Sequence, residues 1–172
     1  MPALDHNSEF CRTEAWYHAA NAVLVGDIEI GAESSIWYHT VVRGDDAPIR
    51  IGRRVNLQDL CLLHPDPGIP LVIEDDVTVG HRAILHCRRI GRGSLIGMGA
   101  VLMKDVEIGA GSLVAGGAVI SPGTIVPPNS LVRGVPGKVA RPTTDAERAD
   151  IQRSVEKYAA TAREFLQRYG RS

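Results

Sequence analysis

The stretch IGRGSLIGMGAVLMKDVEIGAGSLVAGGAVI, residues 90–120, decides the fold, because an aliphatic residue stands at every sixth position. The repeat continues unbroken to residue 132. Toward the N-terminus it runs back to residue 30, with irregular steps between residues 42 and 51, 63 and 73, and 85 and 90. Isoleucine, leucine or valine fills every repeat position: Ile30, Ile36, Val42, Ile51, Leu57, Leu63, Ile73, Val79, Leu85, Ile90, Ile96, Leu102, Ile108, Val114, Ile120, Val126 and Val132.

Two further columns keep the same register. Small or β-branched residues stand four positions after most aliphatic residues, as Ser94, Ala100 and Val106 do, and glycine directly follows many of them. This combination is the hexapeptide signature of a parallel β-helix, in which three short strands form one triangular coil. An α/β protein with scattered strands would show helical periods between its strands, and residues 30–132 show none.

The predicted fold is therefore an all-β solenoid followed by one C-terminal helix. The repeat resembles the left-handed parallel β-helix of the hexapeptide-repeat proteins, and the resemblance implies that handedness. Residues 143–172 carry apolar side chains at helical spacing, with Thr144 and Glu147 in a capping-box pattern and Gly170 as the stop. We expect a β-helix domain over residues 1–142 and a helix over 143–172 that packs on it.

Net charge, hydropathy and cysteine spacing indicate which classes of partner and which compartment to expect. The formal net charge is −1 and no basic run occurs, so we expect no nucleic-acid partner. No apolar stretch approaches the roughly 18 residues that a membrane span needs. The N-terminus lacks the charged and apolar regions of a secretory signal, and the three cysteines lack disulfide-scaffold spacing. We expect a cytoplasmic protein with reduced thiols.

The histidines fall into two groups on the predicted coil. His64 and His86 each directly follow a repeat position, Leu63 or Leu85, so they stack on one side about 4.8 Å apart along the axis. His81 lies on the preceding side, beyond a corner, and should point away from His86. If three solenoids pack as a trimer, His64 and His86 of one chain could meet His81 of the next. Three imidazoles with an open fourth position are the ligand set of a catalytic zinc site.

Three segments together resemble the γ-class carbonic anhydrases: VVRGDDAPIRIGRRVNLQDLCLLH (41–64), VTVGHRAILH (77–86) and IGMGAVL (96–102). The similarity spans about residues 15 to 142. It implies a homotrimer with a metal between subunits, held by His64, His81 and His86. The metal is zinc in most preparations of the family, and Fe²⁺ or Co²⁺ can replace it.

The resemblance also implies roles for polar neighbours of the metal. Arg43, Asp45 and Asp59 would form a polar cluster across the interface. Gln58 would hydrogen-bond the metal-bound water, and Asn56 would help to orient the surrounding network. The opposing interpretation of all five residues is structural service, as turn formers and interface pairs.

Two departures from the family pattern affect the expected activity. The third histidine is followed by Cys87, where many relatives have glycine, and a packed thiol or a reactive thiol would both fit there. The long acidic loop of well-studied members is reduced to residues 65–70, where Asp66 is the sole acid. Asp46 matches a second acidic position of the family's site. Asp46 or Asp66 would then pass the proton to buffer.

The leading hypothesis is an enzyme, a γ-class lyase that reversibly hydrates CO₂ to bicarbonate by a metal-bound hydroxide at the trimer interface. Two alternatives stay open. Many hexapeptide proteins transfer acyl groups from coenzyme A, with a histidine as general base and no metal. The short loop also fits a catalytically silent, metal-stabilised trimer that serves as a scaffold or accessory protein.

Overall fold

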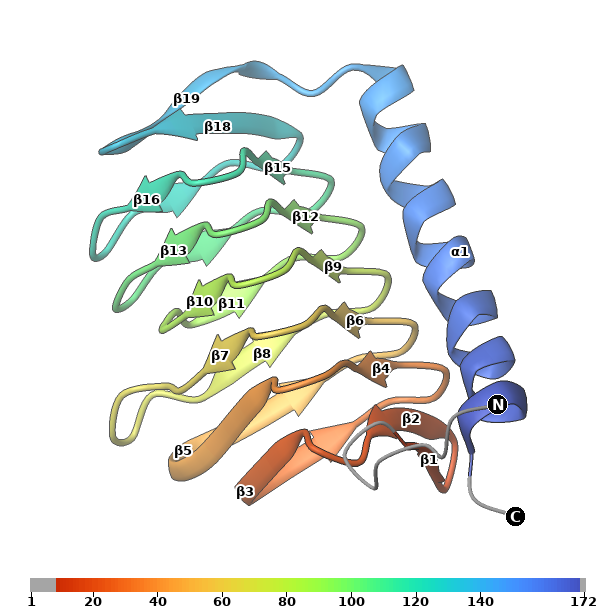
Figure 1. Cartoon of the computed structure of the whole chain (residues 1–172). Helices are drawn as coiled ribbons and strands as arrows, with labels where there is room; N and C mark the ends of the chain where they lie inside the picture. Colours follow the sequence, from red (N-terminus) through yellow and green to blue (C-terminus); the bar gives the residue numbers. More distant parts are fainter. Residues whose placement is uncertain (1–8, 171–172) are drawn as a thin grey trace.

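The computed structural model describes residues 9–170 and shows a left-handed parallel β-helix with one long helix along its side (Figure 1). The predicted fold class is confirmed. Residues 1–8 and 171–172, the outer ends of the two expected domains, lie outside the described residues. Strand β19 ends at Pro142, and helix α1 begins at Asp145.

Three faces make up the solenoid, and each is a ladder of short strands. Face 1 carries β2 (Trp16–Ala19), β4 (Ser35–Ile36), β6 (Asn56–Leu57), β9 (Thr78–Val79), β12 (Leu95–Ile96), β15 (Leu113–Val114) and β18 (Ser130–Gly134), with β1 (Phe10–Thr13) and β19 (Gly137–Pro142) antiparallel at its two ends. Face 2 carries the first halves of β3 (Val23–Ile30) and β5 (Val41–Ile51), then β7 (Leu62–Leu63), β10 (Ile84–Leu85), β13 (Val101–Leu102) and β16 (Val119–Ile120). Face 3 carries the second halves of β3 and β5, then β8 (Leu71–Ile73), β11 (Arg89–Ile90), β14 (Glu107–Ile108) and β17 (Ile125–Val126).

Parallel pairing stacks the repeat positions, as their period predicts. Leu63 pairs in register with Leu85, and Leu85 with Leu102. The inward aliphatic residues from Ile36 onward are buried and form one continuous core. Neighbouring coils approach closely where glycine follows a repeat position. A Cβ on Gly97, which follows Ile96, would lie 2.5 Å from the backbone nitrogen of Gly116 in the next coil. The hexapeptide pattern therefore follows from the tight stacking of coils.

Two of the irregular steps in the repeat have different structures. The nine-residue step from Val42 to Ile51 lies within β5, which continues unbroken from face 2 to face 3 and pairs with β3 and then β8. The step from Leu63 to Ile73 does include a loop, residues 64–70, ahead of β8. Both insertions lie next to His64, so they shape the surface around it.

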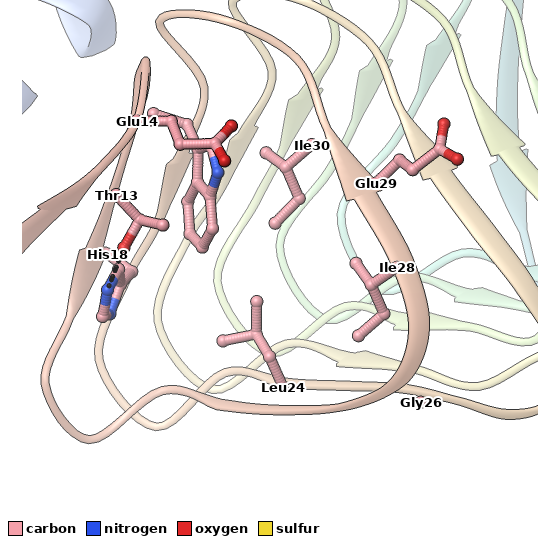
Figure 2. Close-up of a pocket in the computed structure, with 9 residues that line it drawn as sticks. Thr13, Glu14, His18, Leu24, Gly26, Ile28, Glu29 and Ile30 are labelled. Atoms are coloured by element: carbon pink, nitrogen blue, oxygen red, sulfur yellow. Dashed lines mark hydrogen bonds between the residues drawn. The ribbon is translucent and has the colours of Figure 1, made fainter.

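The N-terminal end of the solenoid is hollow. A cavity of about 590 Å³ opens there between β2 and β3, and Trp16, Leu24, Ile28 and Ile30 form its apolar lining (Figure 2). These side chains face the solenoid interior at its first coil, where no preceding coil lies against them within the described residues. None of the predicted site residues lines this cavity.

Helix α1 (Asp145–Tyr169) packs against face 1 and reaches the N-terminal strands (Figure 1). Ile151, Val155, Ala159 and Ala162 form its buried side. Near its C-terminal end, Phe165 lies against Phe10 and Trp37 in an aromatic cluster. Within residues 9–170, no helix combines the length and apolar character needed to cross a membrane.

The predicted capping box is present at the start of α1. The Thr144 hydroxyl accepts from the Glu147 backbone N–H, and the Glu147 carboxylate accepts from the Thr144 backbone N–H. Arg141 binds the same carboxylate at 2.8 Å. Together, the Arg141 guanidinium first and the Thr144 N–H second lower the pKa of Glu147 to about 2. Gly170 ends the helix in an extended conformation.

This pKa gives a testable pH dependence. Because the folded pKa of Glu147 lies below its ordinary value of 4.5, its contribution to stability is complete above pH 4.5 and is lost as the pH falls toward about 2. Glu147→Gln should lower the thermal midpoint at pH 6, and the gap to the wild type should close between pH 4.5 and 2. The control is Glu164→Gln, on the exposed side of the same helix. A gap of constant size across this pH range would contradict the assignment.

Candidate functional site

His64 and His86 stack on face 2, as their register predicts. Each directly follows the last residue of its strand, and β7 pairs with β10 in register. The imidazole centroids lie 5.9 Å apart, with the ring planes tilted by 50°. Both side chains are partly buried and remain accessible from outside the coil. Two imidazoles of one chain therefore present themselves together on one surface.

Backbone carbonyls fix the orientation of both rings. His64 Nδ1 lies 3.2 Å from the Arg43 carbonyl oxygen, and His86 Nδ1 contacts the His64 carbonyl oxygen. A carbonyl oxygen only accepts, so each Nδ1 donates and each Nε2 of the neutral ring keeps its lone pair. Metal-binding histidines are commonly held in this way through the nitrogen that does not bind the metal. The arrangement suits coordination through both Nε2 atoms.

His81 lies on the turn after β9, on face 1, so the expected separation from His86 by a corner is confirmed. Its Nδ1 lies 2.8 Å from Asp59 Oδ2, and its backbone N–H donates to Gln58 Oε1 at 3.2 Å. A carboxylate that holds the second nitrogen of a metal-binding histidine is a frequent arrangement. His81 is thus oriented like the other two, with Nε2 left for a ligand.

Gln58 and Asn56 support His81 from beneath. Both are buried on face 1, where Gln58 Nε2 donates to Asn56 Oδ1 at 3.2 Å and Asn56 Nδ2 donates to the Thr78 hydroxyl at 2.9 Å. This chain of hydrogen bonds ties the turn that carries His81 to strand β6. A groove of about 380 Å³ opens beside it, lined on its outer side by Met98 and Tyr158.

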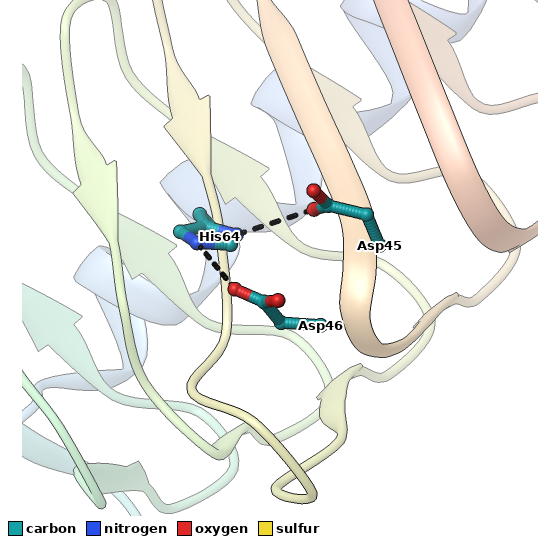
Figure 3. A group of neighbouring side chains, drawn as sticks. All are labelled: Asp45, Asp46 and His64. Atoms are coloured by element: carbon teal, nitrogen blue, oxygen red, sulfur yellow. Dashed lines mark ion pairs between the residues drawn. The ribbon is translucent and has the colours of Figure 1, made fainter.

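Carboxylates lie close to the imidazole nitrogens on face 2. Asp46 Oδ2 lies 3.2 Å from His64 Nε2, and Asp45 Oδ1 lies 3.8 Å from its Nδ1 (Figure 3). Asp66 Oδ1, from the short loop, lies 3.1 Å from His86 Nε2. The three groups Asp45, Asp46 and His64 each offer a ligand atom, and these atoms all lie within 4.8 Å of one another. The site therefore combines imidazole nitrogens with carboxylate oxygens, a donor set that fits zinc, iron or cobalt.

The carboxylates beside the two histidines are ionised. Burial raises the pKa of Asp66, but His86 and then Lys104 outweigh burial, so its pKa lies below the ordinary value. The pKa of Asp45 is also below its ordinary value. Burial raises this pKa, but hydrogen bonds from its own backbone N–H and from Arg43 together lower it by more. Both groups are therefore carboxylates at neutral pH.

Of the predicted cluster of Arg43, Asp45 and Asp59, the structure brings only the first two together within one chain. Arg43 Nη1 lies 2.8 Å from Asp45 Oδ2 on face 2, whereas Asp59 lies on face 1 with His81. The sequence analysis missed Lys104, whose Nζ lies 3.4 Å from Asp66 Oδ2. Lys104 follows Leu102, the repeat position stacked on Leu85, so a search of the next coil on face 2 would have found it.

Comparison with known proteins identifies relatives of this chain. Residues 89–122 match the family model described as bacterial transferase hexapeptide (six repeats). The chain is 53% identical over 135 residues to a carbonic anhydrase of Geobacillus kaustophilus, covering 78% of this chain and 74% of that protein. It is 46% identical over 151 residues to a probable carbonic anhydrase of Methanocaldococcus jannaschii, covering 88% and 94%.

The chain belongs to the γ-carbonic anhydrase-like family of hexapeptide-repeat proteins. Solved structures of similar proteins carry other names. One from Bacillus cereus, titled a putative acetyltransferase, is 43% identical with a TM-score of 0.81, covering 87% of this chain and 91% of that chain. Membership in the γ-carbonic anhydrase-like family is thus shown, while the reaction of this member depends on its own site.

Cys87 adjoins His86 but points into the core. Cys87 and Cys61 are both buried, and burial raises the pKa of each thiol to about 12. Cys11 is half-buried at the N-terminal end. This geometry favours the packed thiol over the reactive one.

Cysteine labelling tests that conclusion. At pH 8, iodoacetamide should modify Cys11 alone in the folded protein and all three cysteines in urea, because the two core thiols are shielded and protonated. Mass spectrometry of the digested protein gives the result for each residue. Rapid modification of Cys87 in the folded protein would contradict its structural role.

Proposed function

We propose that the protein is a homotrimeric, metal-dependent enzyme that interconverts CO₂ and bicarbonate, with each site shared between two subunits. One observation carries the proposal. Each of His64, His81 and His86 has its Nδ1 held by an oxygen acceptor of its own chain, which directs Nε2 to a ligand. In this structure Arg43 contacts that nitrogen of His64, and Asp66 contacts that nitrogen of His86. Two of these nitrogens lie on face 2 and one on face 1, so a single chain does not bring all three together.

The outer surfaces of the solenoid support trimer assembly through face 2. The outward residues stacked along face 2 are all apolar: Val23, Val41, Leu62, Ile84, Val101 and Val119. Three of them, Val23, Leu62 and Ile84, remain 47%, 38% and 40% exposed. The corresponding row on face 3 is mostly charged: Glu29, Arg50, Val72, Arg89, Glu107 and Ile125. An apolar row of this kind is typical of a subunit interface.

The columns beside the apolar row are complementary in charge. On face 2, Arg43 precedes His64 and His86 in one column, and on face 1 Asp59 precedes His81 in another. If face 2 of one subunit packs on the part of face 1 beside helix α1 that carries Asp59 and His81 in the next subunit, the two columns face each other. His64 and His86 then share a metal with His81 of the partner subunit, as the family resemblance implies.

Zinc is the expected metal, and Fe²⁺ or Co²⁺ fit the same donors. A divalent ion held by three neutral imidazoles supplies a nucleophile from water near neutral pH. The residues of the chain would then orient the attacking water and accept its proton. Gln58 accepts from the His81 backbone N–H, Asn56 holds Gln58 in place, and the Gln58 amide would hydrogen-bond water at the site. Asp46 and Asp66 lie beside the ligand nitrogens and accept the proton at their carboxylate oxygens.

Measuring the metal content and the rate of CO₂ hydration distinguishes the proposed function from two others, acyl transfer and a catalytically silent scaffold. Acyl transfer is favoured by the similarity to the putative acetyltransferase from Bacillus cereus, and it needs no metal. A silent scaffold is favoured by the short loop, in which Asp66 is the sole acid. Purified protein with one metal per subunit and CO₂ hydration supports the proposal. Metal without hydration indicates the scaffold, and absence of metal indicates the transferase.

The activity itself is tested by stopped-flow hydration of CO₂ on zinc-loaded protein. Loss of a ligand in His81→Ala should remove activity, and Asp59→Asn should weaken metal binding about 10- to 100-fold, because Asp59 orients His81. Asp27→Asn, on the distant part of β3, is a control that should retain both. Hydration that survives removal of all three histidines would overturn the proposal.

Mixed trimers test the sharing of the site. His64→Ala and His81→Ala remove ligands from opposite faces, so neither mutant alone completes a site. In a mixed trimer of the two, the face 2 of an His81→Ala subunit meets the intact His81 of an His64→Ala subunit at one seam. Co-refolding should therefore restore metal to about one third of the sites in each mixed trimer.

The matched control is the pair His64→Ala and His86→Ala. Both changes lie on face 2, so every seam of their mixed trimers lacks a ligand and none should be restored. Metal content after gel filtration gives the measurement. Complementation between these two mutants, or its absence between His64→Ala and His81→Ala, would show that the ligands are assigned to the wrong faces.

A further inference from the structure

Arg43 contacts both nitrogens of His64. Its carbonyl oxygen accepts from Nδ1 at 3.2 Å, and its guanidinium Nη2 lies 2.7 Å from Nε2. Asp45 holds the other end of the guanidinium, with Asp45 Oδ2 2.8 Å from Nη1. The guanidinium is thus fixed beside Nε2 by two hydrogen bonds, one to His64 and one to Asp45.

The contact at Nε2 excludes a metal from the same atom. Guanidinium nitrogens only donate, so His64 Nε2 accepts this hydrogen bond with its lone pair. Coordination needs that same lone pair, and the positive charge of Arg43 also repels a divalent cation at this distance. Arg43 therefore competes directly with any metal for His64.

The other two histidines are placed differently. His86 Nε2 faces the Asp66 carboxylate at 3.1 Å, and the Asp59 carboxylate lies 2.8 Å from His81 Nδ1. Negative groups attract a cation to these two histidines, and Asp46, whose Oδ2 lies 3.2 Å from His64 Nε2, does the same at His64. His64 is the one ligand of the three whose Nε2 is met by a cationic donor among the described contacts.

We propose that Arg43 is a latch that controls metal loading, and that it must leave His64 Nε2 before the site is complete. This inference rests on the proposed function, because it takes His64 as a metal ligand. The Arg43 side chain is 43% exposed and lies in the column of face 2 with His64. In the proposed trimer this column faces Asp59 of the partner subunit, whose carboxylate would form an ion pair with the Arg43 guanidinium. Subunit assembly then draws the latch off His64, and Arg43 is a positioning residue for the metal.

The test is the rate at which Co²⁺ enters the metal-free protein, followed by its visible absorption in a stopped-flow instrument. Arg43→Met keeps the bulk of the side chain and removes the donor and the charge. Metal should enter this variant about tenfold faster than the wild type, because a hydrogen bond to a charged group is lost from the competing state. Asp45→Asn removes only the second anchor of the guanidinium and should give an intermediate rate.

Two controls separate the latch from a general effect of charge or assembly. Arg43→Lys keeps a charged donor and should load near the wild-type rate. Arg50→Met removes an arginine on face 3, which is bound to Asp27, and should leave the rate unchanged. Sedimentation confirms that each variant is compared as the same oligomer. If Arg43→Met does not assemble, the Asp45→Asn rate decides.

Each outcome decides the matter. Co²⁺ binding by the wild type with no acceleration in Arg43→Met or Asp45→Asn overturns the latch and leaves the proposed function standing. Co²⁺ binding by neither the wild type nor any variant overturns the metal site, and the latch with it. Binding by Arg43→Met that is faster than binding by the wild type supports both.

Discussion

The backbone ladder between successive coils is the constraint on which the rest of the structure depends. Parallel pairing places equivalent residues of neighbouring coils directly above one another, as Leu63, Leu85 and Leu102 show. A side chain that directly follows a repeat position therefore stacks on the equivalent side chain of the next coil. The stacked imidazoles of His64 and His86 are a direct result of this spacing.

The same ladder divides the surface into faces with different tasks. Helix α1 packs on face 1, charged residues pair along face 3, and an exposed apolar row follows face 2. Under the proposed function, a ligand set spread over faces 1 and 2 would close only between subunits. Assembly and metal binding would then be linked, because a metal that binds only the assembled protein stabilises it by mass action.

Much of the fold follows from the sequence because the period of six leaves little freedom. The burial of the repeat positions, the stacking of His64 with His86 and the separation of His81 all depend only on backbone register. The capping box at Thr144 is equally local, since its two partners stand three residues apart.

Contacts that depend on long side chains could not be predicted in this way. The reach of Arg43 to His64 Nε2 and of Lys104 to Asp66 depends on rotamers, which register does not determine. The continuous course of β5 through its nine-residue step was also missed, because the insertion has no repeat position to place it. The packing of a partner subunit cannot be deduced from the repeat register of one chain.

The central claim is that the metal lies between subunits, and anomalous diffraction from zinc-loaded crystals tests it most directly. The account predicts one peak per subunit, each within bonding distance of Nε2 of His64 and His86 and of Nε2 of His81 from the partner subunit. A peak held within one chain by Asp45, Asp46 and His64 alone would contradict it.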